Sequence, residues 1–255
     1  MQIADLHCHI LPRLDDGPKH ESESLELLKE EQQGGIQEIA LTSHYDCEDI
    51  PLNEFLEKRE DSYRSLRRFL KGSNFNENFI SMKRAAEVRF SPNLYNIDLT
   101  PLCIEGTEFM LLELPHIRPP YLNETIFHIQ SCGITPIIAH IERCQYIMDD
   151  LSILYNFVEK ELIVQMNANT LLTNRHKTKN FLKLIKWNLV HILASDAHSM
   201  QRRPPNLPEA IRKVFDCLGE AAAENLCSAS HLIFNGIRPE FDAAYCPKKM
   251  LWRWI

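Results

Sequence analysis

Short apolar runs alternate along most of the chain with longer stretches in which apolar residues recur at helical spacing. This alternation predicts parallel β/α units rather than a β-sandwich or a helical bundle. The apolar runs predict seven strands, near Ile3–Cys8, Gln37–Ser43, Phe79–Val88, Met110–Leu114, Thr135–His140, Ile163–Ala168 and His191–Ser195. The pattern therefore predicts one α/β domain over residues 1–255, in which residues from about 240 onward form a tail.

Six of these predicted strands end in ionisable or amide side chains, within the sequences LTSHY, AAEVRF, LLELP, IIAHIERC, QMNANTL and LASDAHS. For any one of these residues, a core histidine or a salt-bridged carboxylate is the simpler interpretation. Independent buried polar residues would not all lie at strand ends, however, and strand ends are where the catalytic groups of barrel folds gather. A buried, unpaired carboxylate such as Glu113 would also cost several kcal/mol. The pattern therefore predicts a functional site in which bound cations offset buried charge.

The segment DLHCHILPRLDDGP near the amino terminus gives this site its first wall. In an extended strand, His7 and His9 point to the same face and can hold one divalent cation. We expect the strand to run as far as Pro12, and the following turn to bring Asp15 and Asp16 within reach of a second cation. A His-x-His pair alone is weak evidence, because a polar strand end looks the same, and the downstream strand ends strengthen it.

Composition narrows the possible partners and the compartment. The chain has 255 residues and a formal net charge of -7, so its long-range field disfavours a nucleic-acid partner. The eight cysteines are irregularly spaced, form no C-x-x-C pair and follow no recognisable secretory leader, which predicts free thiols in a reducing cytoplasm. No apolar run approaches the ~20 residues that span a bilayer, so we expect at most peripheral membrane contact.

The ordered motifs DLHCHILPRLDDGP, TSHY, AAEVRF, LLELP, AHIERC and SDAHSMQRRPP resemble those of the bacterial capsule and exopolysaccharide protein-tyrosine phosphatases. These enzymes belong to the PHP (polymerase and histidinol phosphatase) superfamily, and the likeness covers the chain from about Ile3 to Ile237. It implies the PHP fold, a distorted seven-stranded TIM-like (β/α) barrel with a metal centre at the carboxyl ends of its strands. That centre would hold two or three divalent metal ions, with manganese favoured and iron, zinc and magnesium as alternatives.

The resemblance also assigns the functional residues. The metal-ligand pattern of the family falls on His7, His9, Asp16, His44, Glu87, Glu113, His140, Asp196 and His198, with Glu87 as the bridging carboxylate. The phosphate-binding arginines of the family match Arg143 and Arg203, and Arg202 competes for the second role. Arg89 departs from the family, which more often has an aromatic residue here, and we expect it to pair with an acid rather than to touch substrate.

The chemistry that follows is hydrolysis of phosphotyrosine by a metal-activated water, without a phosphoenzyme. Hydroxide would attack phosphorus in line, Arg143 and Arg203 would neutralise the phosphoryl oxygens, and a tyrosinate would leave. A cysteine-dependent tyrosine phosphatase is excluded, because none of the eight cysteines has an arginine six residues later. We therefore expect Cys8, on the opposite strand face from His7, to serve packing.

The resemblance implies a specific partner, the phosphorylated tyrosine-rich tail of a bacterial tyrosine kinase that controls capsular and exopolysaccharide synthesis and export. Two alternatives stay open: a histidinol-phosphate phosphatase or other small-molecule phosphoesterase, and a non-catalytic PHP module that binds a partner. The complete ligand set argues against the second of these. Asn167 and Asn169 either line the pocket or satisfy backbone groups, and the terminal MLWRWI either packs on its own domain or docks on a partner or membrane.

Overall fold

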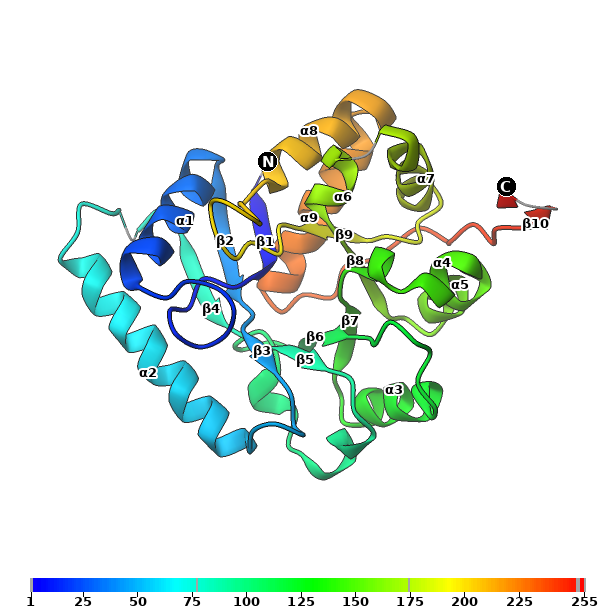
Figure 1. Cartoon of the computed structure of the whole chain (residues 1–255). Coiled ribbons are helices and arrows are strands. Elements are labelled where there is room, and N and C mark those ends of the chain that lie inside the picture. Colours follow the sequence, from blue (N-terminus) through cyan, green and yellow to red (C-terminus); the bar gives the residue numbers. More distant parts are fainter. Residues whose placement is uncertain (1, 77, 174, 251–252, 255) are drawn as a thin grey trace.

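A curled parallel sheet surrounded by helices forms the centre of the computed structural model, which describes residues 2–76, 78–173, 175–250 and 253–254 (Figure 1). One part of the sheet has the order β1-β2-β4 and the other β3-β5-β6-β7-β8-β9, with every neighbouring pair parallel. A parallel bridge between Cys8 and Ala197 joins β1 to the segment after β9. The strands are β1 Ile3–Cys8, β2 Ile36–Leu41, β3 His44–Tyr45, β4 Ser81–Arg84, β5 Glu87–Arg89, β6 Phe109–Glu113, β7 Thr135–Ile138, β8 Ile163–Asn167 and β9 Ile192–Ala194.

Helices follow most of the strands and cover the outside of the sheet (Figure 1). Helix α2 illustrates why, since its buried residues Phe55, Leu66 and Leu70 recur at helical spacing and present one stripe to the core. The α-helices are α1 Glu21–Gln33, α2 Leu52–Lys71, α3 Leu122–Ser131, α4 Gln145–Asp149, α5 Leu151–Glu159, α6 Ala168–Thr173, α7 Arg175–Lys186, α8 Leu207–Leu218 and α9 Glu220–Phe234. Three short 3-10 helices are η1 Pro92–Asn96, η2 Thr100–Leu102 and η3 Ile141–Arg143. Among the described residues, no helix is both long and apolar enough to cross a membrane.

The inner face of the sheet changes from apolar to polar along the strands. On β8, Ile163, Gln165 and Asn167 share one face because side chains alternate. Ile163 belongs to a buried apolar cluster with Ile233 and Phe234 of α9, whereas Gln165 and Asn167 are buried polar residues. The apolar end anchors the strands on α9, and the polar end forms the layer in which the candidate ligands lie.

The parallel α/β architecture predicted from the sequence is confirmed, but the count of seven strands is not. The run predicted for Gln37–Ser43 contains β2, and β3 follows just beyond it at His44, whereas the run predicted for Phe79–Val88 is divided between β4 and β5. The division between β4 and β5 lies at Ala86, whose N–H donates to the carbonyl of Leu102 in η2 and not to a neighbouring strand.

Two further expectations concern the ends of the chain. The first strand ends at Cys8, four residues before Pro12, so His9 lies beyond it. At the other end the backbone of Lys249–Met250 pairs antiparallel with Arg253–Trp254 as β10 and β11. The prediction for the side chains of the terminal MLWRWI lies outside the described residues, and the single domain over 1–255 stays a prediction.

Candidate metal centre

Glu87, the first residue of β5, lies at the middle of the predicted site. Its Oε2 atom is 3.2 Å from Nε2 of both His7 and His9 and 3.0 Å from Nδ1 of His44. Its Oε1 atom is 2.7 Å from Nε2 of His140. One fully buried carboxylate therefore faces four imidazole rings, which is the arrangement expected of a bridging ligand.

His7 and His9 lie side by side, as the alternation of side chains in an extended segment predicts. Nε2 of His7 and Nε2 of His9 are 3.2 Å apart, and the same two atoms lie 3.5 and 3.6 Å from Oδ1 of Asp196. Cys8 points away, and its Sγ atom donates to the carbonyl of Ala40 at 3.3 Å. The expectation that Cys8 packs behind the histidines agrees with this geometry.

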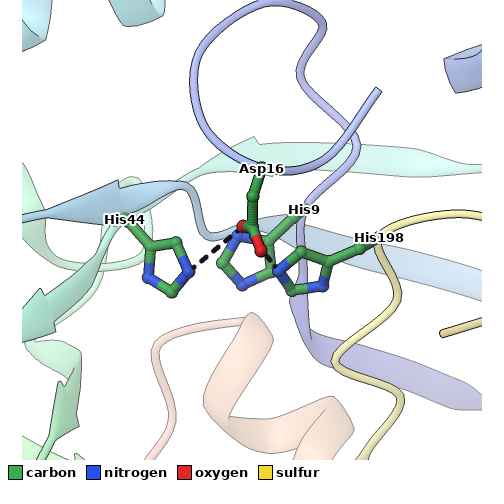
Figure 2. Close-up of side chains that lie close together, drawn as sticks. All are labelled: His9, Asp16, His44 and His198. Carbon is green, nitrogen blue, oxygen red and sulfur yellow. Dashed lines mark ion pairs between the residues drawn. The ribbon is translucent and has the colours of Figure 1, made fainter. Parts of the chain in front are cut away.

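A second group surrounds Asp16, which follows the first strand in a loop (Figure 2). Oδ1 of Asp16 lies 3.1 Å from Nε2 of His198 and 3.4 Å from Nε2 of His44, and His9, just after β1, joins this group. The side chains of Asp16 and His44 are 59% and 40% exposed, whereas Glu87 is buried. The centre is therefore open to solvent on the side of Asp16 and His44.

The remaining candidates complete the ring of strand ends. Glu113, the last residue of β6, lies 3.6 Å from Nε2 of His140 through its Oε1 atom. His140 and Asp196 have positive φ values of 29° and 54°, and non-glycine residues in this left-handed region cost roughly 1–2 kcal/mol. The strain is consistent with a functional role for both residues, because strained backbone persists where the surroundings fix it.

The structure therefore brings together all nine sequence-predicted ligands. Three subsets have ligand atoms within 4.8 Å of one another: His9 with Asp16, His44 and His198; His7 with His9 and Glu87; and His44 with Glu87 and Glu113. Glu87 belongs to two of these subsets, as a shared ligand would. Whether these residues bind metal stays a prediction at this stage.

The electrostatics of the centre follow from burying acids among histidines. Burial alone would lower the pKa of His7, but the charges of Glu87 and Asp196 outweigh it and raise the pKa to about 9. Burial likewise opposes the shift of Glu87, yet the surrounding imidazoles lower the pKa of its carboxyl well below the ordinary value. His198 differs, because burial and the neighbouring His9 lower its pKa to about 4. Negative charge is thus concentrated at Glu87 and Asp196.

These residues fit a group of divalent cations. Oε2 of Glu87 and Nε2 of His198 are buried without a hydrogen-bond partner among the described residues, although imidazole and carboxylate atoms lie 3.0–3.2 Å away. Two ligands bound to one cation at about 2.1 Å, at angles between 90° and 110°, are separated by about 3.0–3.4 Å. The donor set of imidazole nitrogens and carboxylate oxygens suits manganese, iron or zinc.

The two predicted phosphate-binding arginines border the carboxylates. Arg143, the last residue of η3, places Nη2 in very close contact with Oδ2 of Asp196. Arg203 places Nη1 3.4 Å from both oxygens of Asp196 and Nη2 2.8 Å from Oδ2 of Asp16. Both guanidinium groups therefore stand at the rim of the centre, where they can meet an anion.

The two competing arginines lie differently. The side chain of Arg202 is exposed, and its backbone N–H donates to Oγ of Ser199. Nη1 of Arg89 is paired with Oδ2 of Asp46 at 2.9 Å, as expected for an arginine that pairs with an acid. The geometry thus favours Arg203 over Arg202 for the second phosphate contact.

Two further residues hold the candidate ligands: Asp15, which the sequence placed within reach of a cation, and Gln165, which sequence reasoning missed. Asp15 accepts a hydrogen bond from Nδ1 of His9 at 2.8 Å through its Oδ2 atom, so it orients a ligand instead of serving as one. Gln165 contacts Nδ1 of His7 at 3.2 Å. The DD pair was the one available signal for Asp15, and the sequence carries none for Gln165. The side chain of Asn167 lines the site and does not serve backbone groups, because its Nδ2 atom donates to Oδ2 of Asp196 at 2.8 Å.

The sequence is similar to known proteins over most of its length. The family model for capsular polysaccharide synthesis proteins CpsB/CapC matches residues 3–232. CapC of Staphylococcus aureus is 32% identical over 213 residues, which cover 79% of each chain. The tyrosine-protein phosphatase YwqE of Bacillus subtilis is 30% identical over 216 residues, which cover 82% of each chain.

Solved structures show the same fold. A chain from the crystal structures of YwqE from Bacillus subtilis and CpsB from Streptococcus pneumoniae, described there as unique metal-dependent tyrosine phosphatases, superimposes with a TM-score of 0.85. It is 24% identical, and the match covers 97% of this chain and 100% of that chain. The phosphotriesterase homology protein from Escherichia coli, with phosphate in its active site, matches with a TM-score of 0.52 at 11% identity over 91% of this chain and 98% of that chain.

Proposed function

The chain belongs to the CpsB/CapC family of capsular polysaccharide synthesis, and on that premise we propose that it is a metal-dependent protein-tyrosine phosphatase. One observation carries the proposal: nine imidazole and carboxylate side chains converge at the carboxyl ends of the strands, with two arginines on their rim. The relatives named as tyrosine-protein phosphatases are similar over most of this chain. The same enzymatic activity is the simplest use of this donor set on a fold that these relatives share.

We propose that the centre holds two or three divalent cations, manganese before iron, zinc or magnesium. His7, His9, Asp16, His44, Glu87, Glu113, His140, Asp196 and His198 would hold them, with Glu87 between two cations. When bound, such ions supply a water nucleophile that is ionised near neutral pH and neutralise charge on a phosphoryl group. Nine ligands exceed what one ion takes, which supports more than one cation.

The arginines bind and orient the phosphate. Arg143 and Arg203 each share Asp196, and each guanidinium has five N–H donors, so both keep donors for phosphate oxygens. These donors would hold and orient the phosphate at the rim of the centre, and bound cations would supply further charge neutralisation. The open side at Asp16 and His44 gives a protruding side chain access to this position.

A phenolic leaving group suits this centre. The tyrosine hydroxyl has a pKa of about 10 and leaves as tyrosinate with less help from a general acid than an alkyl alcohol needs. All eight cysteines are free thiols, and burial raises the pKa of Cys8 well above its ordinary value, which disfavours a thiolate nucleophile. The metal route is therefore the better account of phosphate hydrolysis here.

The partner we propose is the phosphorylated tyrosine-rich tail of a bacterial tyrosine kinase that controls capsular or exopolysaccharide synthesis. The family match to capsular polysaccharide synthesis proteins supports this context, and free thiols support a reducing cytoplasm as the place. A flexible tail would reach the exposed side of the centre without rearrangement of the sheet.

Paired kinetics on three substrates test the proposed function. Manganese-loaded protein should hydrolyse a phosphotyrosyl peptide and an aryl phosphate with higher kcat/KM than histidinol phosphate. A higher kcat/KM for histidinol phosphate would instead favour a biosynthetic phosphatase with the same ligands. No turnover of any of the three by metal-loaded protein would indicate a non-catalytic binding module.

A further inference from the structure

Two amides on β8 connect candidate ligands that come from different strands. Gln165 and Asn167 are two residues apart, so they share the inner face of the sheet, and both are buried. Gln165 contacts His7 on β1, and Asn167 contacts Asp196 after β9. Their own side chains are joined, because Nε2 of Gln165 donates to Oδ1 of Asn167 at 2.8 Å.

The groups at the two ends of this series of hydrogen bonds, the N–H of His140 and the carboxylate of Asp196, decide which atom donates in each bond. The backbone N–H of His140 donates to Oε1 of Gln165 at 2.6 Å, so the atom at that position is the amide oxygen. The amide nitrogen of Gln165 then faces Asn167, which must present its own oxygen. Nδ2 of Asn167 is left for Oδ2 of Asp196, and a carboxylate oxygen accepts such a bond. No other assignment of the two amides satisfies both ends.

This assignment also fixes the tautomer of His7. Oε1 of Gln165 can only accept, so Nδ1 of His7, 3.2 Å away, must carry a proton. In the neutral ring Nε2 is then unprotonated, and its lone pair faces Glu87 and Asp196 at 3.2 and 3.5 Å. That is the form of imidazole that binds a cation.

The same logic applies to Asp196. Its Oδ2 atom is occupied by Asn167 and Arg143, which leaves Oδ1 directed at Nε2 of His7 and of His9. Metal-binding histidines commonly donate their second ring nitrogen to a neighbouring acceptor, and loss of that acceptor weakens metal binding. His9 follows this rule with Asp15, and His7 does so with a side-chain amide.

We propose that Gln165 and Asn167 act as one positioning unit that sets the metal affinity of the centre by fixing the tautomer of His7 and the orientation of Asp196. The inference rests on the proposed metal-dependent function. The two residues contact candidate ligands rather than the reacting atoms, so they are positioning residues. Both residues lie on β8, and they contact candidate ligands on β1 and after β9. Contacts between segments so far apart in sequence leave no trace in local sequence patterning.

Manganese affinity, measured by equilibrium dialysis or calorimetry on metal-stripped protein, tests the proposal. Gln165→Leu should weaken manganese binding by about 10–100-fold, the range for loss of an outer hydrogen-bond partner. Gln165→Glu keeps an acceptor for His7 and His140 but cannot donate to Asn167, so its loss should be smaller. Asn167→Ser removes the donor to Asp196 and the acceptor for Gln165 but leaves the contact of Gln165 with His7, so its loss should also fall between wild type and Gln165→Leu.

His191→Phe is the matched control. His191 is also buried and bonded to the backbone N–H of β8 at Val164, but it contacts none of the nine candidate ligands within the described residues. It should lower the melting temperature without changing manganese affinity. If Gln165→Leu fails to fold, Gln165→Glu and Asn167→Ser give the same comparison.

Unchanged affinity within twofold in all three variants, or an equal loss in His191→Phe, would overturn the inference while leaving the proposed function intact. Absence of manganese binding by wild type would overturn both.

Discussion

His7 near the carboxyl end of β1 and His191 at the amino end of β9 are both buried, with 0% and 5% of their surface exposed, yet they differ in charge. Nδ1 of His191 accepts a hydrogen bond from the N–H of Val164 at 3.0 Å, and its ring stacks on Phe241. Burial lowers the pKa of His191 to about 4, so this ring is neutral. For His7, Glu87 and Asp196 outweigh burial and raise the pKa to about 9.

The contrast shows that burial by itself does not identify a functional histidine. A buried ring with a backbone donor and an aromatic neighbour is packing, and a buried ring among carboxylates is part of an ionic centre. The carboxyl ends of the strands gather acids and histidines, whereas the amino ends are closed by apolar residues of α9. Variants at the carboxyl ends should therefore lower activity, whereas variants at the amino ends should lower stability.

The largest effect is expected from Glu87→Gln. An amide keeps the size of the side chain but removes the charge that faces four imidazole rings, so metal occupancy and kcat/KM should both fall by more than about 100-fold. Metal content by elemental analysis and turnover of a phosphotyrosyl peptide check this.

His191→Phe should lower stability and leave activity nearly unchanged. It leaves the N–H of Val164 unpaired, which costs about 1–3 kcal/mol of unfolding free energy, while activity stays within a fewfold of wild type. Equal activity losses in Glu87→Gln and His191→Phe would erase the distinction between the two ends.

The next largest effect is expected from the two arginines at the rim of the centre. Arg143→Ala should lose at least about tenfold in kcat/KM with its metals retained, because a charge-assisted hydrogen bond is worth about 1.5–3 kcal/mol. Arg203→Ala should behave similarly, and Arg202→Ala, with an exposed side chain, serves as the control. If Arg202→Ala loses more than Arg203→Ala, the second phosphate contact has been assigned to the wrong residue.

The two ends should also respond to pH in opposite directions in metal-free protein. The folded-state pKa of His7 and of His9, about 9, lies above the unfolded value of about 6.5. Their contribution to stability is complete below about pH 6.5 and is lost as the pH rises toward 9. His191, with a folded-state pKa of about 4, contributes stability above about pH 6.5 that is lost as the pH falls toward 4.

Melting temperatures between pH 4 and 9.5 check these signs. Metal-free wild type should lose several degrees between pH 6.5 and 9, and His7→Gln should have a shallower slope over the same interval. His191→Phe should have a shallower slope below pH 6.5. A melting temperature of metal-free wild type that is flat or rises between pH 6.5 and 9 would contradict the assigned pKa shifts.

The smallest effect is expected from Cys8→Ser. The thiol lies at the carboxyl end of β1 but faces the carbonyl of Ala40, and a hydroxyl can make the same contact. Activity should stay within about threefold of wild type, and alkylating reagents should inactivate only protein that is unfolding. Rapid stoichiometric inactivation of the folded protein through one cysteine would contradict the metal route.

Much of the centre was predictable because its residues stand at the ends of apolar runs, where the parallel fold gathers them. Glu113 is the last residue of β6 and His140 lies two residues after β7, and the apolar pattern of both strands is unambiguous. The arginines also follow from sequence, although the choice of Arg203 over Arg202 required the contact with Asp16.

The rest depends on long-range contacts and backbone geometry. Gln165 reads as one polar residue within an apolar run, and only its contacts with His7 and His140, far away in sequence, reveal a role. The division between β4 and β5 depends on the hydrogen bond from the N–H of Ala86 to the carbonyl of Leu102, which no local pattern predicts. The positive φ of Asp196 is likewise a feature of the backbone that no pattern in the sequence predicts.

Metal stoichiometry measured together with phosphotyrosine turnover tests the central claim most directly. Protein prepared with excess manganese should retain two or three ions per chain by elemental analysis, and activity on a phosphotyrosyl peptide should disappear with chelation and return as the ions are restored. Less than one metal per chain in fully active protein, or activity that survives complete removal of metal, would contradict the account.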